Sequence, residues 1–385
     1  MLRTSVSTDP ADLEALAPRW RALLGRSARP QPVMTPLWQS TWWRVFGDAE
    51  RRTPWIVTVE DGDSLVGLLL LSWRVTLHRA GIPVRRLELL GTGEKEADEI
   101  CSDYVGAIVA RGMESEVANV LAATLRDAAP NDWDELRMPS MSAEDPFVSE
   151  LAGALGRGGI VTSIETSGEC PYIPLPDTWD GYLQALGSSR RYGVTRSLRE
   201  LEKWAGPGGW ELRRARTAEE LAEGVRVLSQ LHGERWTSAG KSGVFSSDRF
   251  RQFHETVMPR LLAGEDGVSL DLSWLLVRGE PVAAAYNLVH DGRLQFYQSG
   301  RRVDVPKNVK PGIAMHALAI RASIESGLRE YDFLAGASRY KRDLALASRN
   351  LVTLRAVAPG LRARVVEAAR VIAERAIARI RAASH

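Results

Sequence analysis

The chain has 385 residues, of which 44% are hydrophobic and 25% charged. This balance excludes bulk disorder, collagen and membrane-embedded classes and predicts two or three folded domains. Fifty Lys and Arg against 48 Asp and Glu leave a net charge of +2, which is too small to indicate a nucleic-acid surface. The two cysteines, Cys101 and Cys170, are far apart in the sequence and favour neither a disulfide framework nor a zinc cluster. This cysteine content fits a cytoplasmic protein.

The first part of the chain alternates helical and strand patterns. Residues 9–24 place apolar side chains at helical spacing behind an Asp-Pro start. The runs 53–60 and 65–75 flank a turn-forming Asp-Gly-Asp and predict a β-hairpin. Further strands are expected at 85–91, 104–109 and 133–138, and helices at 113–128 and 146–155. No signal-peptide pattern opens the sequence, and no apolar run approaches the roughly 20 residues that span a bilayer.

A similar order of elements restarts after residues 170–176, whose three prolines exclude regular helix. Helices are expected at 178–186, 188–204, 217–234, 247–263 and 311–326, and strands at 210–215, 269–278, 281–290, 293–300 and 331–334. The two halves share an outline of hairpin, strand, helix and strand, so we predict a duplicated α+β unit. The expected bounds are 1–165 for an N-terminal unit, 166–360 for a C-terminal unit and 361–385 for a tail.

The loop 306–312, with the sequence PKNVKPG, lies between a predicted strand and a predicted helix. Its backbone N–H groups would face the positive end of the helix dipole, where an anion can bind, and Lys307 and Lys310 would add charge for a pyrophosphate. The segment matches neither the P-loop nor the GxGxxG pattern. An ordinary polar loop before a proline-initiated helix is the alternative.

Two segments carry groups that can transfer protons. His232 ends a predicted helix beside a carboxylate, a guanidinium and an indole, although a histidine there also serves as a helix cap. There is no HExxH pattern, so we expect no metal. Asp332 interrupts an apolar strand, with Tyr340 and Lys341 shortly downstream; the alternative is an ion pair of Asp332 with Arg339 or Lys341.

The tail carries six arginines against two glutamates and an apolar face at helical spacing. That face consists of Leu361, Val365, Ala368, Ile372, Ala376 and Ile380. A basic amphipathic helix of this kind can lie on anionic lipid, which would make the protein peripheral on the inner membrane. A surface helix packed on the domain is the alternative.

Together these segments resemble the bacterial GNAT-like acyltransferases of the CelD/BcsL type, relatives of the FemAB peptidyl transferases with two GNAT-like units per chain. The matching segments are Pro36-Leu37-Trp38 with Trp42-Trp43, the run 170–176, Leu231-His232 with Arg235-Trp236, Pro281-Val282-Ala283, Tyr297-Gln298-Ser299-Gly300, Pro311-Gly312, and 331–336 with Tyr340-Lys341. They are spread over residues 36–341.

The resemblance implies an α+β fold with mixed, splayed sheets flanked by helices, in tandem GNAT-like units. It also implies an acyl-CoA donor whose pantetheine lies along strand 293–300 and whose pyrophosphate meets loop 306–312. The implied donor-binding residues are Gln298, Gly300, Lys307, Asn308, Lys310 and Gly312. Because the Gln/Arg-x-x-Gly-x-Gly/Ala signature of small GNAT enzymes is absent, acyl carrier protein and aminoacyl-tRNA are alternative donors.

The implied reaction is direct attack of an amine on a thioester. The candidate bases are His232 and Asp332, the candidate acids Tyr340 and Tyr297, and Lys341 would give electrostatic help. Some family members occur beside sphingolipid-making enzymes, which favours a long-chain amino alcohol as acceptor and hence ceramide formation. The 12 tryptophans, several clustered at Trp38, Trp42, Trp43 and Trp55, and the basic tail fit a lipid acceptor.

Two other functions remain open from the sequence. A FemAB-like transferase would add an amino acid to a peptidoglycan precursor, although residues 188–204 are too short for the coiled-coil arm that often accompanies that activity. A non-catalytic accessory protein of exopolysaccharide synthesis would keep the fold without needing proton-transfer groups.

Overall fold

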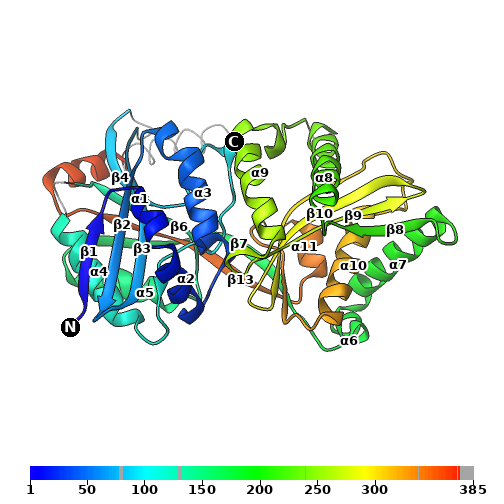
Figure 1. Cartoon of the computed structure of the whole chain (residues 1–385), viewed down its shortest axis with the longest axis horizontal. Helices are drawn as coiled ribbons and strands as arrows, with labels where there is room; N and C mark the ends of the chain where they lie inside the picture. The colour runs from blue at the N-terminus through cyan, green and yellow to red at the C-terminus, as the bar shows by residue number, and fades with distance from the viewer. Residues whose placement is uncertain (78–80, 129–131, 239, 337, 371, 373–385) are drawn as a thin grey trace. The chain divides into compact units, whose positions relative to one another are not determined.

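The computed structural model describes residues 1–77, 81–128, 132–238, 240–336, 338–370 and 372 (Figure 1). The chain forms two compact units. Of the described residues, unit 1 comprises those within 1–93, 101–167 and 350–372, and unit 2 those within 94–100 and 168–349. The chain passes between the units within the strands β7 (Val161–Pro174) and β13 (Ala347–Val357). Residues 350–357 thus group with the N-terminal half and 94–100 with the C-terminal half, which differs from the bounds expected from the sequence.

Unit 1 has a mixed sheet with helices packed on it. Its remaining elements are β1 (Arg3–Ser7), α1 (Ala11–Ala15), α2 (Ala17–Arg26), α3 (Pro36–Phe46), β2 (Thr53–Asp61), β3 (Ser64–Leu77), β4 (Pro83–Leu89), β5 (Ile108–Val109), α4 (Glu114–Ala128), β6 (Glu135–Ser142) and α5 (Pro146–Arg157). The strand order is β1-β2-β3-β4-β6-β13, with β5 on β3. The β2–β3 hairpin is confirmed. The strand expected at 104–109 is limited to β5, because Tyr104 has a φ of 65° that no strand accommodates.

The tryptophan cluster lies in the core of unit 1. Trp38 and Trp42 on α3 are almost fully buried, as are Trp43 and, on β2, Trp55. Trp38 donates its indole N–H to Ser102. These side chains are core residues, so the tryptophan cluster gives no support to a lipid acceptor.

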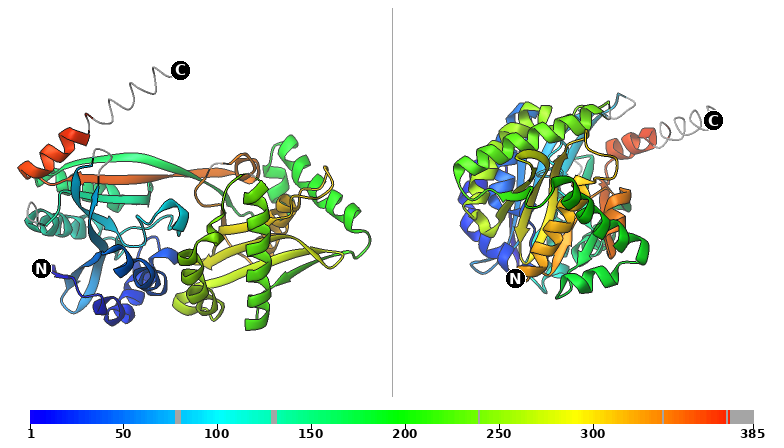
Figure 2. Two further views of the ribbon diagram at one scale, coloured as in Figure 1. Left: turned by 90° about the horizontal axis from the view of Figure 1, so that it is seen from above. Right: turned by 90° about the vertical axis from the view of Figure 1, so that its right-hand side faces the viewer.

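The sheet of unit 2 has the order β7-β12-β11-β10-β9-β8. Its elements are α6 (Trp179–Ala185), α7 (Ser188–Ala205), β8 (Trp210–Arg214), α8 (Ala218–Ser238), α9 (Asp248–Leu262), β9 (Ser269–Val277), β10 (Glu280–His290), β11 (Arg293–Arg301), α10 (Pro311–Glu325), β12 (Glu330–Asp332) and α11 (Arg339–Leu344). Helices α8 and α9 cover one face of this sheet, and α7 and α10 cover the other (Figures 1 and 2).

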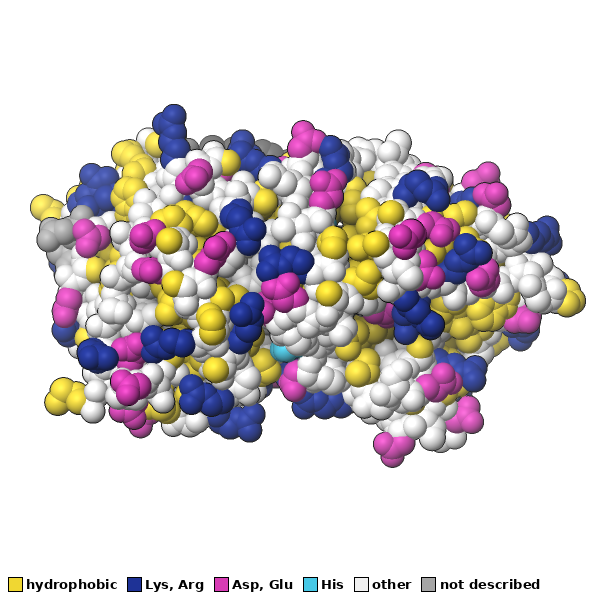
Figure 3. Space-filling model, viewed as in Figure 1, with side chains coloured by type: hydrophobic (Ala, Val, Ile, Leu, Met, Phe, Trp, Pro, Cys, Tyr) yellow, Lys and Arg dark blue, Asp and Glu magenta, His cyan; other side chains and the backbone are white. Residues whose placement is uncertain are grey.

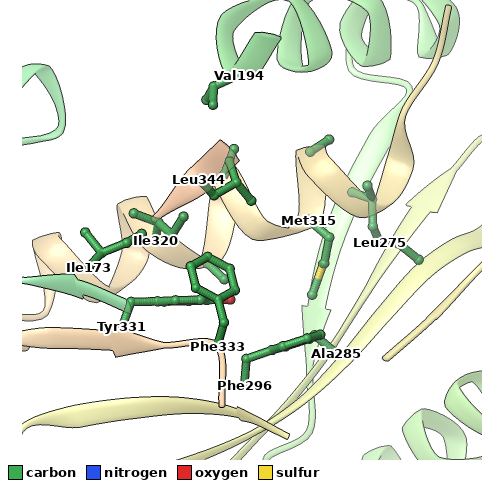
Figure 4. Packing of buried hydrophobic residues seen from close by; sticks show 14 of the residues in the cluster. Ile173, Val194, Leu275, Ala285, Phe296, Met315, Ile320, Tyr331, Phe333 and Leu344 are labelled. Atoms are coloured by element: carbon green, nitrogen blue, oxygen red, sulfur yellow. The ribbon is translucent and has the colours of Figure 1, made fainter. Parts of the chain in front are cut away.

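The strands of unit 2 alternate their side chains between these two helical layers. On β9, Leu272 and Trp274 contact α8 at Gly224, where a Cβ would lie 2.8 Å from Leu272. Leu275, on the opposite face, belongs to the core under α10 with Phe296 and Met315 (Figure 4). Burial on both faces explains why β9 and β10 are apolar almost throughout.

The beginning of the tail is a helix tied to unit 1. Residues 361–370 are helical, and Arg362 pairs with Asp134 at 3.1 Å. Glu367 pairs with Arg370 at 2.7 Å and with Arg355 at 2.5 Å. Ala363 is buried, whereas Leu361, Val365 and Ile372 are exposed. The expected apolar positions therefore face outward; Ala376, Ile380 and the rest of 373–385 lie outside the described residues.

Candidate active site

A gap between two parallel strands positions the site in unit 2. Strands β11 and β12 pair over three residues, ending with Gln295 opposite Asp332. There β12 stops, while β11 continues to Arg301 and pairs only with β10. One side of the backbone of residues 296–301 is therefore left without a strand partner. Such an edge offers N–H and C=O groups to an extended ligand.

The turn after β12 holds this gap open. The Asp332 carboxylate accepts the backbone N–H of Leu334 at 2.7 Å, and Leu334 and Gly336 both have positive φ. The Lys341 ammonium donates to the carbonyls of Phe333 at 2.7 Å and Ala335 at 2.6 Å. Asp332 and Lys341 thus shape the turn, and neither lines the adjacent cavity. The expected alternative partner, Arg339, pairs with Asp343 instead.

The gap opens into a cavity of about 440 Å³, which we call the donor pocket. Its walls come from the end of β11, the connecting loop, the first turns of α10, and single residues of α8 and α11. The lining residues are Arg235, Ser299, Gly300, Arg301, Val303, Val305, Pro306, Lys307, Val309, Lys310, Pro311, Gly312, Ile313, His316 and Tyr340. Of the six donor-binding residues expected from the sequence, four line it: Gly300, Lys307, Lys310 and Gly312.

The donor pocket carries uncompensated positive charge. Among the described residues, no acidic side chain pairs with Arg235, Arg301, Lys307 or Lys310. Partial burial and the neighbouring Arg235 lower the pKa of Arg301, so these two guanidinium groups repel each other. Lys310 is the N-cap residue of α10, and its side chain makes no capping hydrogen bond. A cation therefore lies at the positive end of the helix dipole. An anion would relieve both conflicts.

Two ionisable rings lie side by side in the pocket wall. The rings of His316 on α10 and Tyr340 on α11 are 5.4 Å apart between centroids and tilted by 31°. Burial raises the pKa of the Tyr340 phenol, which keeps its proton at neutral pH. Burial, with the nearby Lys341 and Arg235, lowers the pKa of His316 to about 3, so this imidazole is neutral.

The tautomer of His316 follows from its buried neighbour. Its Nδ1 lies 2.9 Å from the hydroxyl of Tyr331, a residue with no solvent exposure. Among the described residues, His316 Nδ1 is the one acceptor within reach of the Tyr331 hydroxyl. A buried O–H without an acceptor would destabilise the folded protein. We therefore assign the Tyr331 proton to the bond with Nδ1, which leaves the proton of the neutral imidazole on Nε2. His316 is then a hydrogen-bond donor in the pocket wall.

His232 lies behind the pocket wall. Its Nδ1 is 2.9 Å from the carbonyl oxygen of Ser299, so Nδ1 carries the proton and Nε2 keeps its lone pair. Among the described residues that buried Nε2 has no hydrogen-bond partner, and a Cβ on Gly243 would lie 2.7 Å from it. The ring packs on Trp236 and Phe245, and burial lowers its pKa. His232 therefore bonds to β11 through the Ser299 carbonyl and does not line the cavity.

The other candidate residues lie elsewhere. The Tyr297 hydroxyl donates to the carbonyl of Ile100 and lies 3.1 Å from His254 Nε2, within a buried aromatic cluster. Neither Tyr297 nor Gln298 lines the donor pocket. Asn308 lines a neighbouring hollow instead. Gly300 also has a packing role, because a Cβ there would lie 2.4 Å from the backbone nitrogen of His232.

Sequence reasoning missed His316 and Arg301 as site residues. His316 lies within the run PGIAMHALAI, which is typical of a core helix. The available signal was its position five residues after Pro311, one turn beyond the helix start that had been singled out. Arg301 was passed over because one arginine among 44 carries little information by itself.

A family model matches the part of the chain that holds this pocket. Residues 188–342 match the family model described as Acetyltransferase (GNAT) domain. This segment of unit 2 is thus similar to a GNAT acetyltransferase domain. The matched segment includes the β11–β12 gap and every residue of the donor pocket. No curated protein matches the chain.

Solved structures share the fold over most of the chain. FemX matches with a TM-score of 0.56 at 10% identity, covering 90% of this chain and 96% of its own. L-PGS from Bacillus licheniformis matches with 0.51 at 14% identity, covering 96% of each. The C-terminal domain of a putative lysylphosphatidylglycerol synthetase from Agrobacterium fabrum matches with 0.51 at 10%, covering 94% and 97%. At these identities the likeness shows the fold alone, and the expected α+β fold of tandem GNAT-like units is confirmed.

Charge is mixed on the face of the molecule that Figure 3 shows. On the face in Figure 3, basic and acidic side chains are interspersed. Among the described residues, no helix has the length and apolar character needed to cross a membrane.

Proposed function

We propose that this protein is an N-acyltransferase that moves an acyl group from a thioester to a primary amine, with the phosphopantetheine arm of the donor in the donor pocket. One observation carries the proposal: a single cavity joins an unpaired strand edge, an uncapped cationic helix start and a protonated tyrosine. The match of this segment to a GNAT domain supports it.

Each part of the pocket suits one part of a thioester donor. The amide groups of a pantetheine arm can bond to the free edge of residues 296–301, and the diphosphate can lie at the α10 start with Lys307 and Lys310. That order brings the thioester toward Tyr340 and His316. Arg235 and Arg301 supply further positive charge where negative charge develops.

The reaction then needs a hydrogen-bond donor to the thioester carbonyl oxygen and an acid that protonates the leaving thiolate. As the amine nitrogen bonds to the carbonyl carbon, the His316 Nε2–H donates to the developing oxyanion. When the C–S bond breaks, the Tyr340 phenol gives its proton to the thiolate and recovers one from the attacking nitrogen through solvent. The cationic wall disfavours an ammonium ion, so the acceptor reacts as the neutral amine and we assign no base to Asp332 or His232.

The acceptor we favour is a long-chain amine, and a sphingoid base leading to a ceramide is the narrower form of this hypothesis. The support is the helix 361–370, whose exposed Leu361 and Val365 lie beside arginines. An aminoacyl transfer of the FemAB type, or a non-catalytic role in exopolysaccharide synthesis, is the competing function.

The test is product formation with defined pairs of substrates. The purified chain is incubated with acyl-CoAs of graded length and with amines that include long-chain amino alcohols, and products are identified by mass spectrometry. We expect an amide and free CoA in equal amounts, lost in Tyr340→Phe and retained in Tyr192→Phe, an exposed tyrosine on α7. Amide formation with aminoacyl-tRNA but with no acyl-CoA would instead support the FemAB-type function.

A further inference from the structure

Four large apolar side chains of unit 1 are exposed within two short segments. Val75 and Leu77 lie at the end of β3, and Leu361 and Val365 lie on the helix 361–370; each is more than half exposed. Single exposed apolar residues are common on soluble proteins, whereas a contiguous apolar patch marks an interaction surface. We call these four residues the apolar corner.

Hydrogen bonds and ion pairs hold the helix against the β3–β4 hairpin. Leu77 at the end of β3 pairs with Pro83 at the start of β4. The Arg362 guanidinium on the helix donates to the carbonyl of Pro83 at 3.3 Å. It also pairs with Asp134 at 3.1 Å, and the same carboxylate pairs with Arg85 of β4 at 2.7 Å. In Figures 1 and 2 the helix, in red, lies beside the end of this hairpin. The two apolar pairs are therefore parts of one surface.

Positive charge accompanies the apolar corner. Arg364 is exposed on the helix, and within the part of the chain that the structure describes no acidic side chain pairs with it. The Arg362 side chain keeps about half of its surface exposed. Glu367, the acid of this helix, is neutralised by Arg370 at 2.7 Å and by Arg355 at 2.5 Å. Apolar side chains with arginines among them are complementary to an anionic lipid surface, whose acyl chains contact the former and whose headgroups bind the latter.

We propose that the apolar corner binds the surface of a membrane that contains anionic lipid, with the end of β3 and the helix 361–370 in contact with the lipid together. The helix alone offers two large apolar side chains, and the strand end doubles the apolar area that enters the bilayer surface. Another protein, or a second copy of this chain, would cover the same side chains without needing anionic headgroups. The inference does not depend on the proposed acyl transfer, because this contact requires neither a donor nor an acceptor.

Vesicle sedimentation with the full chain tests this inference. The probes are vesicles of phosphatidylcholine alone and vesicles that also contain phosphatidylglycerol. We expect the wild-type chain to bind the second kind at low salt and to bind it more weakly at high salt. Val75→Ser with Leu77→Ser should weaken this binding about tenfold, and Arg364→Gln about fivefold. Val6→Ser is the matched control, since Val6 is an exposed valine on β1 and lies outside the apolar corner.

Three results would overturn the inference. Unchanged vesicle binding in the variant of Val75 and Leu77 would show that the strand end does not contact the lipid. Equal binding to vesicles with and without phosphatidylglycerol would show that anionic headgroups are not recognised. No binding to either kind of vesicle, with self-association of the wild-type chain that the same variant loses, would assign the apolar corner to a second copy. Acyl transfer to a short, soluble amine is measured separately, so none of these results bears on the proposed function.

Discussion

His316 and Tyr340 lie ring against ring in the wall of the donor pocket, 5.4 Å apart between centroids. Their environments set different roles for the two groups. Burial keeps the Tyr340 phenol protonated, and burial with nearby cations keeps the His316 imidazole neutral. A phenol that keeps its proton and an uncharged imidazole therefore lie next to each other in the wall of this cavity.

The first prediction concerns the acid. Tyr340→Phe removes the proton for the leaving thiolate and keeps the ring, so kcat should fall about 100-fold while the KM for the donor changes little. Steady-state kinetics on the folded variant measure this split. Tyr192→Phe should behave as the wild-type enzyme. A kcat within a factor of about two of wild type in Tyr340→Phe would remove Tyr340 from the mechanism.

The second prediction concerns the tautomer of His316. Gln can present an N–H close to the position of Nε2, whereas Phe fills the volume without a donor. We expect His316→Gln to retain most of kcat and His316→Phe to lose about 100-fold. Nitrogen chemical shifts should show the wild-type His316 ring neutral and protonated on Nε2 from pH 8 to pH 5. A shift pattern for the opposite tautomer would contradict the assignment from Tyr331.

The third prediction follows from His254 and His316, each of which has a pKa lowered to about 3 by burial. The pKa of a histidine in the unfolded chain is about 6.5. Below that pH, each of these histidines binds a proton in the unfolded chain but not in the folded chain. With respect to these two histidines, the free energy of unfolding should therefore be highest above pH 6.5. It should fall as the pH drops toward 3, by up to about 1.4 kcal/mol per pH unit for each histidine. Denaturant unfolding between pH 7.5 and 5 measures the slope.

A variant shows whether these histidines cause the slope. His254→Gln removes one of the two groups, so its stability should depend less steeply on pH than that of the wild-type chain, whatever its stability at pH 7.5. Identical slopes in the two proteins would show that His254 is protonated when folded.

The fourth prediction concerns the helix 361–370. Deleting the whole tail would remove one ion-pair partner each from Asp134 and Arg355 and disturb unit 1, so point variants are the cleaner test. Leu361 and Val365 are 80% and 60% exposed. The double variant Leu361→Ser with Val365→Ser should release the protein from phosphatidylglycerol vesicles at low salt. Turnover of a short, soluble acceptor should not change.

A matched control accompanies that vesicle experiment. Val161→Ser alters an apolar side chain that is 71% exposed at the start of β7, far in sequence from the tail, and should leave vesicle binding intact. Equal sedimentation of the wild-type chain and the double variant would show that this helix does not contact the membrane.

Local patterns predicted the hairpins and most helices of the chain. The β9–β10 hairpin follows from two apolar runs around Gly279-Glu280, and Gly279 indeed has positive φ. The single helix expected over 9–24 is two helices, because Pro18 falls near the start of α2 and Leu16 caps it. Strand β7 was missed because its first half is polar and largely exposed, and the prolines at its end argued against a strand.

The site was only partly predictable from the sequence for a related reason. The loop 306–312 carries its own signal, since cations and a Pro-Gly helix start are adjacent in sequence. The surroundings of His232 and Asp332 depend on tertiary contacts. His232 bonds to the carbonyl of Ser299, which is distant in sequence, and Asp332 bonds within a turn that Lys341 stabilises. Spacing along the chain shows that such groups can transfer protons, but not whether they face a cavity.

The central claim is that the thioester donor lies between β11 and the start of α10 in unit 2. Hydrogen exchange of the full chain with and without a non-hydrolysable acyl-CoA thioether tests it most directly. We expect amides within 296–313 to slow on binding, because the free strand edge and the first N–H groups of α10 would gain acceptors. Protection confined to unit 1, with 296–313 exchanging as in the unbound chain, would contradict this account.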